Sequence, residues 1–193
     1  MKRYNNLYNN ICTFNNIKCA YREVCKNTRN QHRVALLKDY EAIYTYRIYK
    51  MLSTRTYKVG PYNHFTIYEP KERQIVSQNV EDKIVNHLVA RYILYPAILP
   101  CLLDVNVASR KNMGTRKGLE LAEKYASICK QKYNTYYILK CDISKFFSNI
   151  DHEILKEKIL RRIKDVDALK IVFDIIDSNT PRTIYSALWP VKF

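Results

Sequence analysis

Apolar side chains recur at helical spacing along most of the chain, and this pattern predicts a largely helical protein. The longest such stretch runs from Gln31 to about Ser53 and is expected to form one amphipathic helix. A second helix is expected from the capping residue Asn79 to about Tyr95, where Pro96 stops or kinks it. A third begins near Thr115, and the positions that it is expected to bury are Leu119, Ala122, Ala126 and Cys129.

Three short segments read as strands instead. Residues 62–68 alternate loosely, end before Pro70, and are expected to pair with residues 73–77 as a β-hairpin. The apolar run Tyr136–Cys141 predicts a buried strand with Asp142 at its C-terminal end. A mostly helical chain with a hairpin and one buried strand indicates an α+β fold.

The two ends of the chain differ in pattern. Asp151 is expected to cap a helix, with Ile150 and Leu155 forming a hydrophobic staple across the cap. Another helix is expected from about Asp167 to Ile176. Residues 1–30 are polar, Asn-rich and weakly periodic, which indicates a loosely packed arm.

Charge is concentrated in two blocks of the sequence. The whole chain carries a formal charge of +15, residues 1–60 hold 12 Lys/Arg against 3 Asp/Glu, and residues 105–140 hold 8 against 2. Eight of the 17 tyrosines fall in the first block. Basic side chains interleaved with aromatic rings suit a nucleic acid, because phosphates are neutralised and bases can stack, although a solubilising surface would have a similar composition.

The six cysteines contain no CxxC pair, and the four histidines do not cluster with them. No signal peptide opens the chain, and the longest apolar run, residues 92–103, is broken by Pro96 and Pro100 and is too short to span a bilayer. A cytoplasmic, reduced protein with no membrane partner is therefore expected.

The segment from Tyr137 to His152, YILKCDISKFFSNIDH, is the sharpest chemical signal. A strand that ends in Asp142 holds a carboxylate at a sheet edge, where it can bind a hard cation such as Mg²⁺. The backbone carbonyl of Ile143 can supply another oxygen. Strand ends of this kind also simply begin turns, so the aspartate alone does not decide between the two readings.

The whole string resembles the first palm motif of reverse transcriptases from group II introns, retrons and diversity-generating retroelements. The resemblance implies that Asp142 is a metal-binding catalytic aspartate. It also implies that Phe147 lies under the sugar of the nucleotide and rejects a 2′-hydroxyl. Phe146 is interpreted as a core aromatic and Asp151 as a helix cap.

Two upstream segments resemble the same family. Residues 65–75, FTIYEPKERQI, look like its fingers hairpin, which implies that Arg73 clamps the incoming nucleotide and that Lys71 assists. Residues 106–118, NVASRKNMGTRKG, are similar to the segment between fingers and palm. There Gly114 and Gly118 are expected to allow close backbone approach, and the expected contacts to the template strand are Arg110, Lys111, Arg116 and Lys117.

The resemblance covers about residues 65–178 and implies a subdomain order. A basic helical N-terminal region (1–60) precedes mostly helical fingers with a β-hairpin (61–134), an incomplete reverse-transcriptase palm (135–178) and an unmatched tail (179–193). The implied partners are an RNA template or RNA–DNA duplex and deoxynucleoside triphosphates. Mg²⁺ is the implied cofactor of the complete enzyme.

The family's second catalytic motif, an aromatic-x-Asp-Asp hairpin, does not occur in this sequence. Asp165 and Asp167 are poor substitutes, because carboxylates are expected at a helix start. Two-metal transfer needs several carboxylates, so Mg²⁺ binding by this chain is expected to be weak or absent. We therefore expect an RNA-directed DNA polymerase family protein that is truncated before the second aspartates and inactive alone. The alternatives are an RNA-binding module and half of a split polymerase completed by a separate C-terminal fragment.

Overall fold

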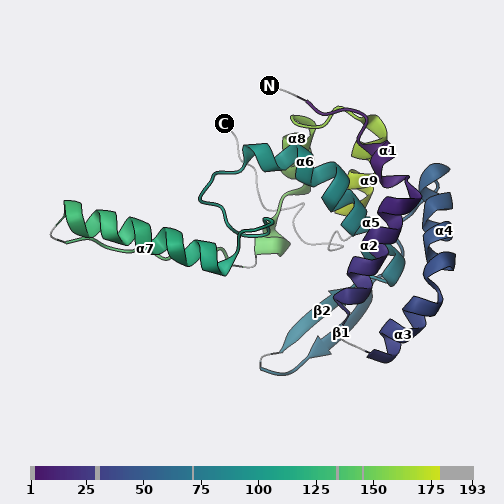
Figure 1. Cartoon of the computed structure of the whole chain (residues 1–193), viewed down its shortest axis with the longest axis horizontal. Coiled ribbons are helices and arrows are strands. Elements are labelled where there is room, and N and C mark those ends of the chain that lie inside the picture. The colour runs from purple at the N-terminus through teal and green to yellow at the C-terminus, as the bar shows by residue number, and fades with distance from the viewer. Residues whose placement is uncertain (1–2, 29–30, 71, 134, 145, 179–193) are drawn as a thin grey trace, which may run out of the picture. The chain divides into compact units, whose positions relative to one another are not determined.

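The computed structural model describes residues 3–28, 31–70, 72–133, 135–144 and 146–178 (Figure 1). The chain is α+β and mostly helical, as predicted. It divides into two compact units: a helical unit made of the residues up to Ala97 and those from Asp151 onward, and an α7 unit, Ile98–Ile150. These units are defined by packing and do not follow the subdomain boundaries expected at residues 60 and 134, so that assignment stays a prediction. The tail 179–193 lies outside the described residues.

The helical unit contains one β-hairpin and most of the helices. The hairpin pairs β1 (Asn63–Ile67) with β2 (Arg73–Ser77). The helices, in chain order, are α1 (Tyr8–Ile11), α2 (Phe14–Lys26), α3 (Gln31–Asp39), α4 (Glu41–Ser53), α5 (Val80–Val89), the π-helical turn η1 (Ala90–Leu94), α6 (Tyr95–Ile98), α8 (His152–Leu160) and α9 (Val166–Asp177).

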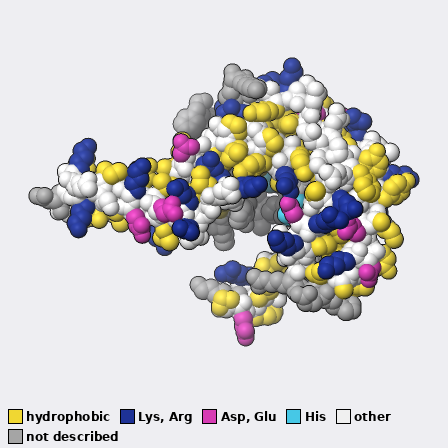
Figure 2. Space-filling view, in the orientation of Figure 1, with side chains coloured by type: hydrophobic (Ala, Val, Ile, Leu, Met, Phe, Trp, Pro, Cys, Tyr) yellow, Lys and Arg dark blue, Asp and Glu magenta, His cyan; other side chains and the backbone are white. Residues whose placement is uncertain are grey.

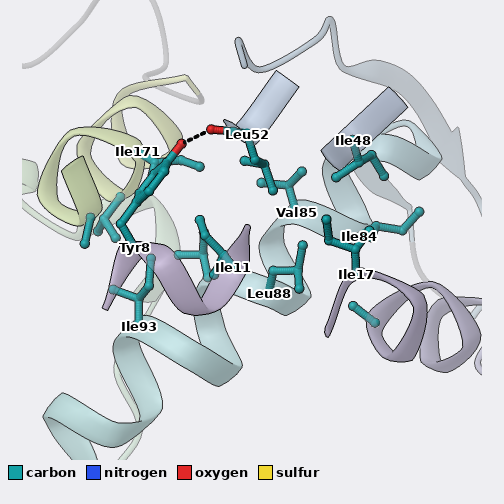
Figure 3. Packing of buried hydrophobic residues seen from close by; sticks show 14 of the residues in the cluster. Tyr8, Ile11, Ile17, Ile48, Leu52, Ile84, Val85, Leu88, Ile93 and Ile171 are labelled. Carbon is teal, nitrogen blue, oxygen red and sulfur yellow. Dashed lines mark hydrogen bonds between the residues drawn. The ribbon is translucent and has the colours of Figure 1, made fainter. Parts of the chain in front are cut away.

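The core of this unit begins in the first 30 residues, so the expectation of a loosely packed arm was wrong. Helix α2 packs against α4 and α5 and buries Ile17, Ala20, Tyr21 and Val24 (Figure 3). Those four positions follow helical spacing, and the charged residues Lys18, Arg22 and Glu23 between them are exposed or half-buried. Burial of one apolar stripe therefore holds a segment whose mean composition is polar.

The single long helix expected from Gln31 to Ser53 is two helices. Tyr40, with φ −98° and ψ 10°, leaves the helical conformation between α3 and α4. The bend separates the buried Leu37 of α3 from the buried Ile48 and Leu52 of α4. Ile43, an apolar residue of α4, is 60% exposed.

Asn79 caps α5 as predicted, because its side chain accepts a hydrogen bond from the backbone N–H of Asp82 at 2.8 Å. The Asp82 carboxylate is itself buried and accepts hydrogen bonds from the Tyr57 hydroxyl (2.7 Å) and the Gly60 N–H (3.0 Å). Burial and this carboxylate raise the pKa of Tyr57. The segment that leads into the hairpin is thereby tied to the start of α5.

The helix does not stop at Pro96. Proline has no N–H, and its ring crowds the carbonyl of the residue four positions earlier. In this chain the π-helical turn η1 precedes Pro96, and the helix continues as α6. The Tyr95 N–H reaches back to the Ala90 carbonyl, which is the five-residue step of a π-turn. By length and composition, Val80–Cys101 is the one helical stretch in the described residues able to cross a membrane, and core helices pass the same test. Ile84, Leu88 and Ile93 on it are buried in this unit.

The N-terminal segment is fastened to the C-terminal helices of the same unit. The Tyr4 N–H donates to the Arg162 carbonyl, and the Lys164 N–H donates to the Tyr4 carbonyl, both at 2.8 Å. Asp165 caps α9 by accepting from the Ala168 N–H at 3.0 Å, and its second oxygen accepts from the Tyr8 N–H at 2.9 Å. Asp165 is therefore a structural cap, as its position in the sequence indicated.

Tyr8 joins α1 to α4, because its buried hydroxyl donates to the Leu52 carbonyl at 2.9 Å (Figure 3). Burial raises the pKa of Tyr8 to about 12. A folded pKa above the unfolded value near 10 contributes stability that is present below pH 10 and is lost as the pH rises toward 12.

We expect Tyr8→Phe to lower the free energy of unfolding by about 1 kcal/mol at pH 8, since the Leu52 carbonyl loses its donor. The difference in free energy of unfolding between wild type and variant should decrease from pH 10 to pH 12, because only the wild type has a Tyr8 proton to lose. Urea unfolding followed by circular dichroism at pH 8, 10 and 11 measures this. A difference in free energy of unfolding that increases with pH would contradict the hydrogen bond from Tyr8 to the Leu52 carbonyl.

The α7 unit contains η2 (Leu99–Cys101), α7 (Thr115–Lys132) and η3 (Phe146–Asn149). Helix α7 begins at Thr115 as predicted, but the burial expected of it was wrong. Leu119 is 60% exposed, Ala122 is exposed, and Ala126 and Cys129 are half-buried. None of the residues of α7 is buried, so this amphipathic helix finds little to cover its apolar side within the described chain.

Candidate nucleic-acid interface

The fingers-like hairpin forms where it was predicted. Its register pairs Phe65 with Ile75 and Ile67 with Arg73, so Arg73 opens β2 at the end nearest the turn. Arg73 is exposed, which leaves its guanidinium accessible to a ligand. Lys71, its expected helper, lies outside the described residues.

The basic loop before α7 is closed by one of its own arginines. Nη1 of Arg110 donates to the carbonyls of Leu103 and Asn106, both at 3.0 Å. This nitrogen of Arg110 therefore orders the loop, and only the rest of the guanidinium is left for a phosphate. Lys111 next to it is exposed.

The two glycines of this segment serve different needs. Gly114 precedes α7 with φ 113°, a backbone conformation that side chains disfavour, and a Cβ there would meet nothing within 4 Å. A Cβ on Gly118 would lie 3.2 Å from Cγ2 of Val107, so the loop packs closely against the first turn of α7. Gly118 therefore leaves room for the Val107 side chain, and Gly114 is required for its torsion angle. The close backbone approach expected at both glycines stays a prediction.

Arg116 and Lys117 lie in the first turn of α7 and share one acidic neighbour. Arg116 Nε lies 3.4 Å from Glu120 Oε1, and Lys117 Nζ lies 3.0 Å from Glu120 Oε2. The Arg116 side chain is 95% exposed. Figure 2 shows further Lys and Arg side chains along α7, with fewer acidic ones among them. The first turn keeps a net positive charge next to unpaired helix N–H groups, which favours an anion.

The strand expected at Tyr136–Cys141 does not form, and this prediction was wrong. The residues are irregular, and Tyr137, Ile138 and Leu139 are 93%, 82% and 87% exposed. A strand is stabilised by backbone hydrogen bonds to a neighbour, and the β1–β2 hairpin is the only sheet in the part of the chain that the structure describes. An apolar run thus remains without the sheet that its sequence suggests.

Asp142 and Ile143 follow this irregular run and are both exposed, so no sheet edge holds the carboxylate in place. Phe147 lies in η3, and its side chain is outside the described part. Phe146, expected in the core, is 50% exposed. The η3 turn is closed by the Asn149 amide, which donates to the Ser144 carbonyl at 3.1 Å.

The acidic residues near the palm motif do not assemble into a metal site. Asp151 caps α8 by accepting from the N–H groups of Glu153 (2.9 Å) and Ile154 (3.1 Å), as predicted. Among the described residues, no group of three or more His, Cys, Asp and Glu side chains is placed to hold a metal ion. A single exposed carboxylate and one carbonyl do not make the donor set that two Mg²⁺ ions require.

The predicted site residues belong to two separate units. Arg73 lies in the helical unit, whereas Arg110, Lys111, Arg116, Lys117 and Asp142 lie in the α7 unit. The implied roles of Arg73 and Asp142 toward one nucleotide therefore stay predictions. Within the α7 unit, Arg110 and Lys111 lie in one loop, and Arg116 and Lys117 share Glu120.

Sequence reasoning missed a cavity bordered by Lys26 and Lys38 in the helical unit. These lysines lie on different helices and come together only because α3 packs beside α2. No local motif marks them. The basic character of the first 60 residues is the one signal that points toward them.

A scan against protein-family models finds no match for this chain, and a search of curated proteins finds no relative.

Proposed function

We propose that this chain is the fingers and first part of the palm of an RNA-directed DNA polymerase of the bacterial retroelement type, and that it binds RNA or an RNA–DNA duplex. The observation that carries the proposal is the joint order of three motifs, at residues 65–75, 106–118 and 137–152, along one chain. The formed hairpin, with Arg73 exposed beside its turn, is consistent with the first motif.

The surface chemistry supports the nucleic-acid part of the proposal. Lys111, Arg116 and Lys117 are exposed and Arg110 is half-buried, and together they carry more positive charge than Glu120 neutralises. Phosphate contacts of this kind position a strand without reading its sequence. We therefore propose binding that depends strongly on salt and weakly on base sequence.

Catalysis by this polypeptide alone is not proposed. The sequence contains no Asp-Asp dipeptide, and Asp142 is exposed on an irregular segment. The donor set does not fit the metal ions of the complete enzyme, so no reaction step is assigned to it here.

A second candidate is half of a split polymerase, completed by a separate polypeptide. The specific observation in its favour is the exposed apolar run Tyr137–Leu139, because such a run gains stability when another chain pairs with it and covers it. An RNA-binding module without any catalysis predicts the same nucleic-acid affinity. Such a module should tolerate Asp142→Ala, whereas a split polymerase completed by its second polypeptide should lose activity.

Binding should weaken steeply with salt. About six phosphate contacts would give a slope of log K against log salt of about −4 to −5. Fluorescence anisotropy of a labelled RNA–DNA duplex at several salt concentrations measures it. Arg116→Ala/Lys117→Ala should reduce the magnitude of the slope by about 2. Lys158→Ala/Lys164→Ala, which changes two exposed lysines outside the three motifs, should leave the slope unchanged. A slope near zero would refute the proposal.

Asp142→Ala should not weaken duplex binding, since the carboxylate is exposed and repels phosphate. Primer extension on an RNA template with Mg²⁺ and deoxynucleotides should give no product with the wild-type chain. If the wild type extends the primer and Asp142→Ala does not, the chain is a complete enzyme and the partial-palm assignment is wrong.

A further inference from the structure

An open cavity of about 470 Å³ lies in the helical unit where the end of α2, the start of α4 and α3 come together. Its lining is Tyr21, Arg22, Cys25, Lys26, Thr28, Val34, Lys38 and Glu41. This volume is in the range of sites that enclose small molecules. All of these residues precede the segments that resemble a reverse transcriptase, so the cavity is independent of the proposed function.

The inner surface of the cavity is apolar and fixed. Tyr21 and Cys25 are 1% and 8% exposed, and Val34 is half-buried. The Tyr21 hydroxyl donates to the Leu37 carbonyl, so it is already satisfied and links α2 to α3. A ligand with an apolar ring or short chain could rest against Tyr21, Cys25 and Val34, where the Tyr21 hydroxyl is already paired.

The rim of the cavity is positively charged. Among the described lining residues Glu41 is the one acidic residue, and it lies within 3.3 Å of Arg22 and 3.8 Å of Lys18. Among the described side chains, no carboxylate lies within ion-pair distance of Lys26 or Lys38, and both lysines are exposed. Two cations on different helices thus face the same opening without an acidic partner.

We propose that this cavity binds a small anion with an apolar body, such as an aromatic phosphate, with the body against Tyr21, Cys25 and Val34 and the anionic group between Lys26 and Lys38. Neither part is sufficient alone, because the apolar surface provides no charge recognition and exposed lysines hold a free anion weakly. A nucleic-acid strand would fit poorly, since the lining is one local cavity rather than a groove that follows a backbone.

Isothermal titration calorimetry in a phosphate-free buffer tests the proposal with three probes. 1-Naphthyl phosphate carries both features, 1-naphthol lacks the anion, and inorganic phosphate lacks the apolar body. We expect 1-naphthyl phosphate to bind one site with saturation below about 1 mM, and the other two to bind about tenfold more weakly or worse.

Charge reversal and filling of the cavity then locate the site. Lys26→Glu/Lys38→Glu should weaken 1-naphthyl phosphate about tenfold or more, since each charged contact is lost. The control Lys50→Glu/Lys58→Glu makes the same change in net charge at exposed lysines outside the lining and should stay within about twofold. Val34→Trp extends a half-buried side chain into the cavity and should abolish saturable binding.

Circular dichroism spectra and melting temperatures confirm that each variant is folded before it is titrated. Three results would overturn the proposal. The first is no saturable binding of 1-naphthyl phosphate to the wild type. The others are an equal loss of affinity in Lys26→Glu/Lys38→Glu and Lys50→Glu/Lys58→Glu, or undiminished binding to folded Val34→Trp. None of these measurements depends on duplex binding, so the proposal stands or fails separately from the proposed function.

Discussion

Asp165→Ala is expected to lower the free energy of unfolding by about 2–4 kcal/mol. The substitution removes the cap of α9, worth about 1 kcal/mol, and leaves the N–H of Tyr8 without an acceptor in a buried position, which costs about 1–3 kcal/mol more. Asp165→Asn keeps a single acceptor oxygen and should fall between wild type and Asp165→Ala. Urea unfolding followed by circular dichroism gives all three values.

Asp151→Ala is the matched control for that result. Asp151 also caps a helix with two backbone hydrogen bonds, but it is exposed and both donors are its own neighbours in α8. Its loss should cost about 1 kcal/mol. Equal losses for the two aspartates would show that the long-range bond from Tyr8 to Asp165 contributes nothing.

Ile48→Ala should destabilise the chain by about 2–5 kcal/mol, because the side chain is fully buried among α2, α4 and α5 and its removal leaves a cavity (Figure 3). Ile43→Ala makes the same chemical change five residues earlier in α4, where the side chain is 60% exposed. It should change stability by less than about 0.5 kcal/mol. Similar losses for both would mean that the outer side of α4 is covered in solution.

Features set by a few neighbouring residues could be predicted from the sequence. Asn79 and Asp151 were recognised as caps because the cap bond joins a side chain to an N–H only two or three residues away. The hairpin followed from local alternation around Pro70. Features that need a distant partner were not predictable in this way. The run Tyr136–Cys141 has the composition of a strand, but no described strand lies beside it. Leu119 lies on the apolar side of α7, but no described element covers it and it is exposed.

The candidate site shows the same division. The position of Arg73 beside the turn follows from the register of one hairpin. The use of an Arg110 nitrogen by two loop carbonyls depends on the fold of the loop, where Ser109 and Asn112 have positive φ angles of 55° and 62°. A run of basic residues in the sequence does not show which of their side chains is hydrogen-bonded to the backbone of the loop.

The bonds of Tyr4 and Tyr8 to residues 162–165 also govern when the protein can fold during synthesis. The Tyr8 N–H and its acceptor on Asp165 are 157 residues apart, and Ile163, Ala168, Ile171 and Val172 complete the same core. A ribosome adding about 5–20 residues per second needs roughly 10–30 s to make that stretch. For this time Leu7 and Ile11 lack the C-terminal helices of the same core, so the nascent chain exposes apolar surface until α9 leaves the exit tunnel.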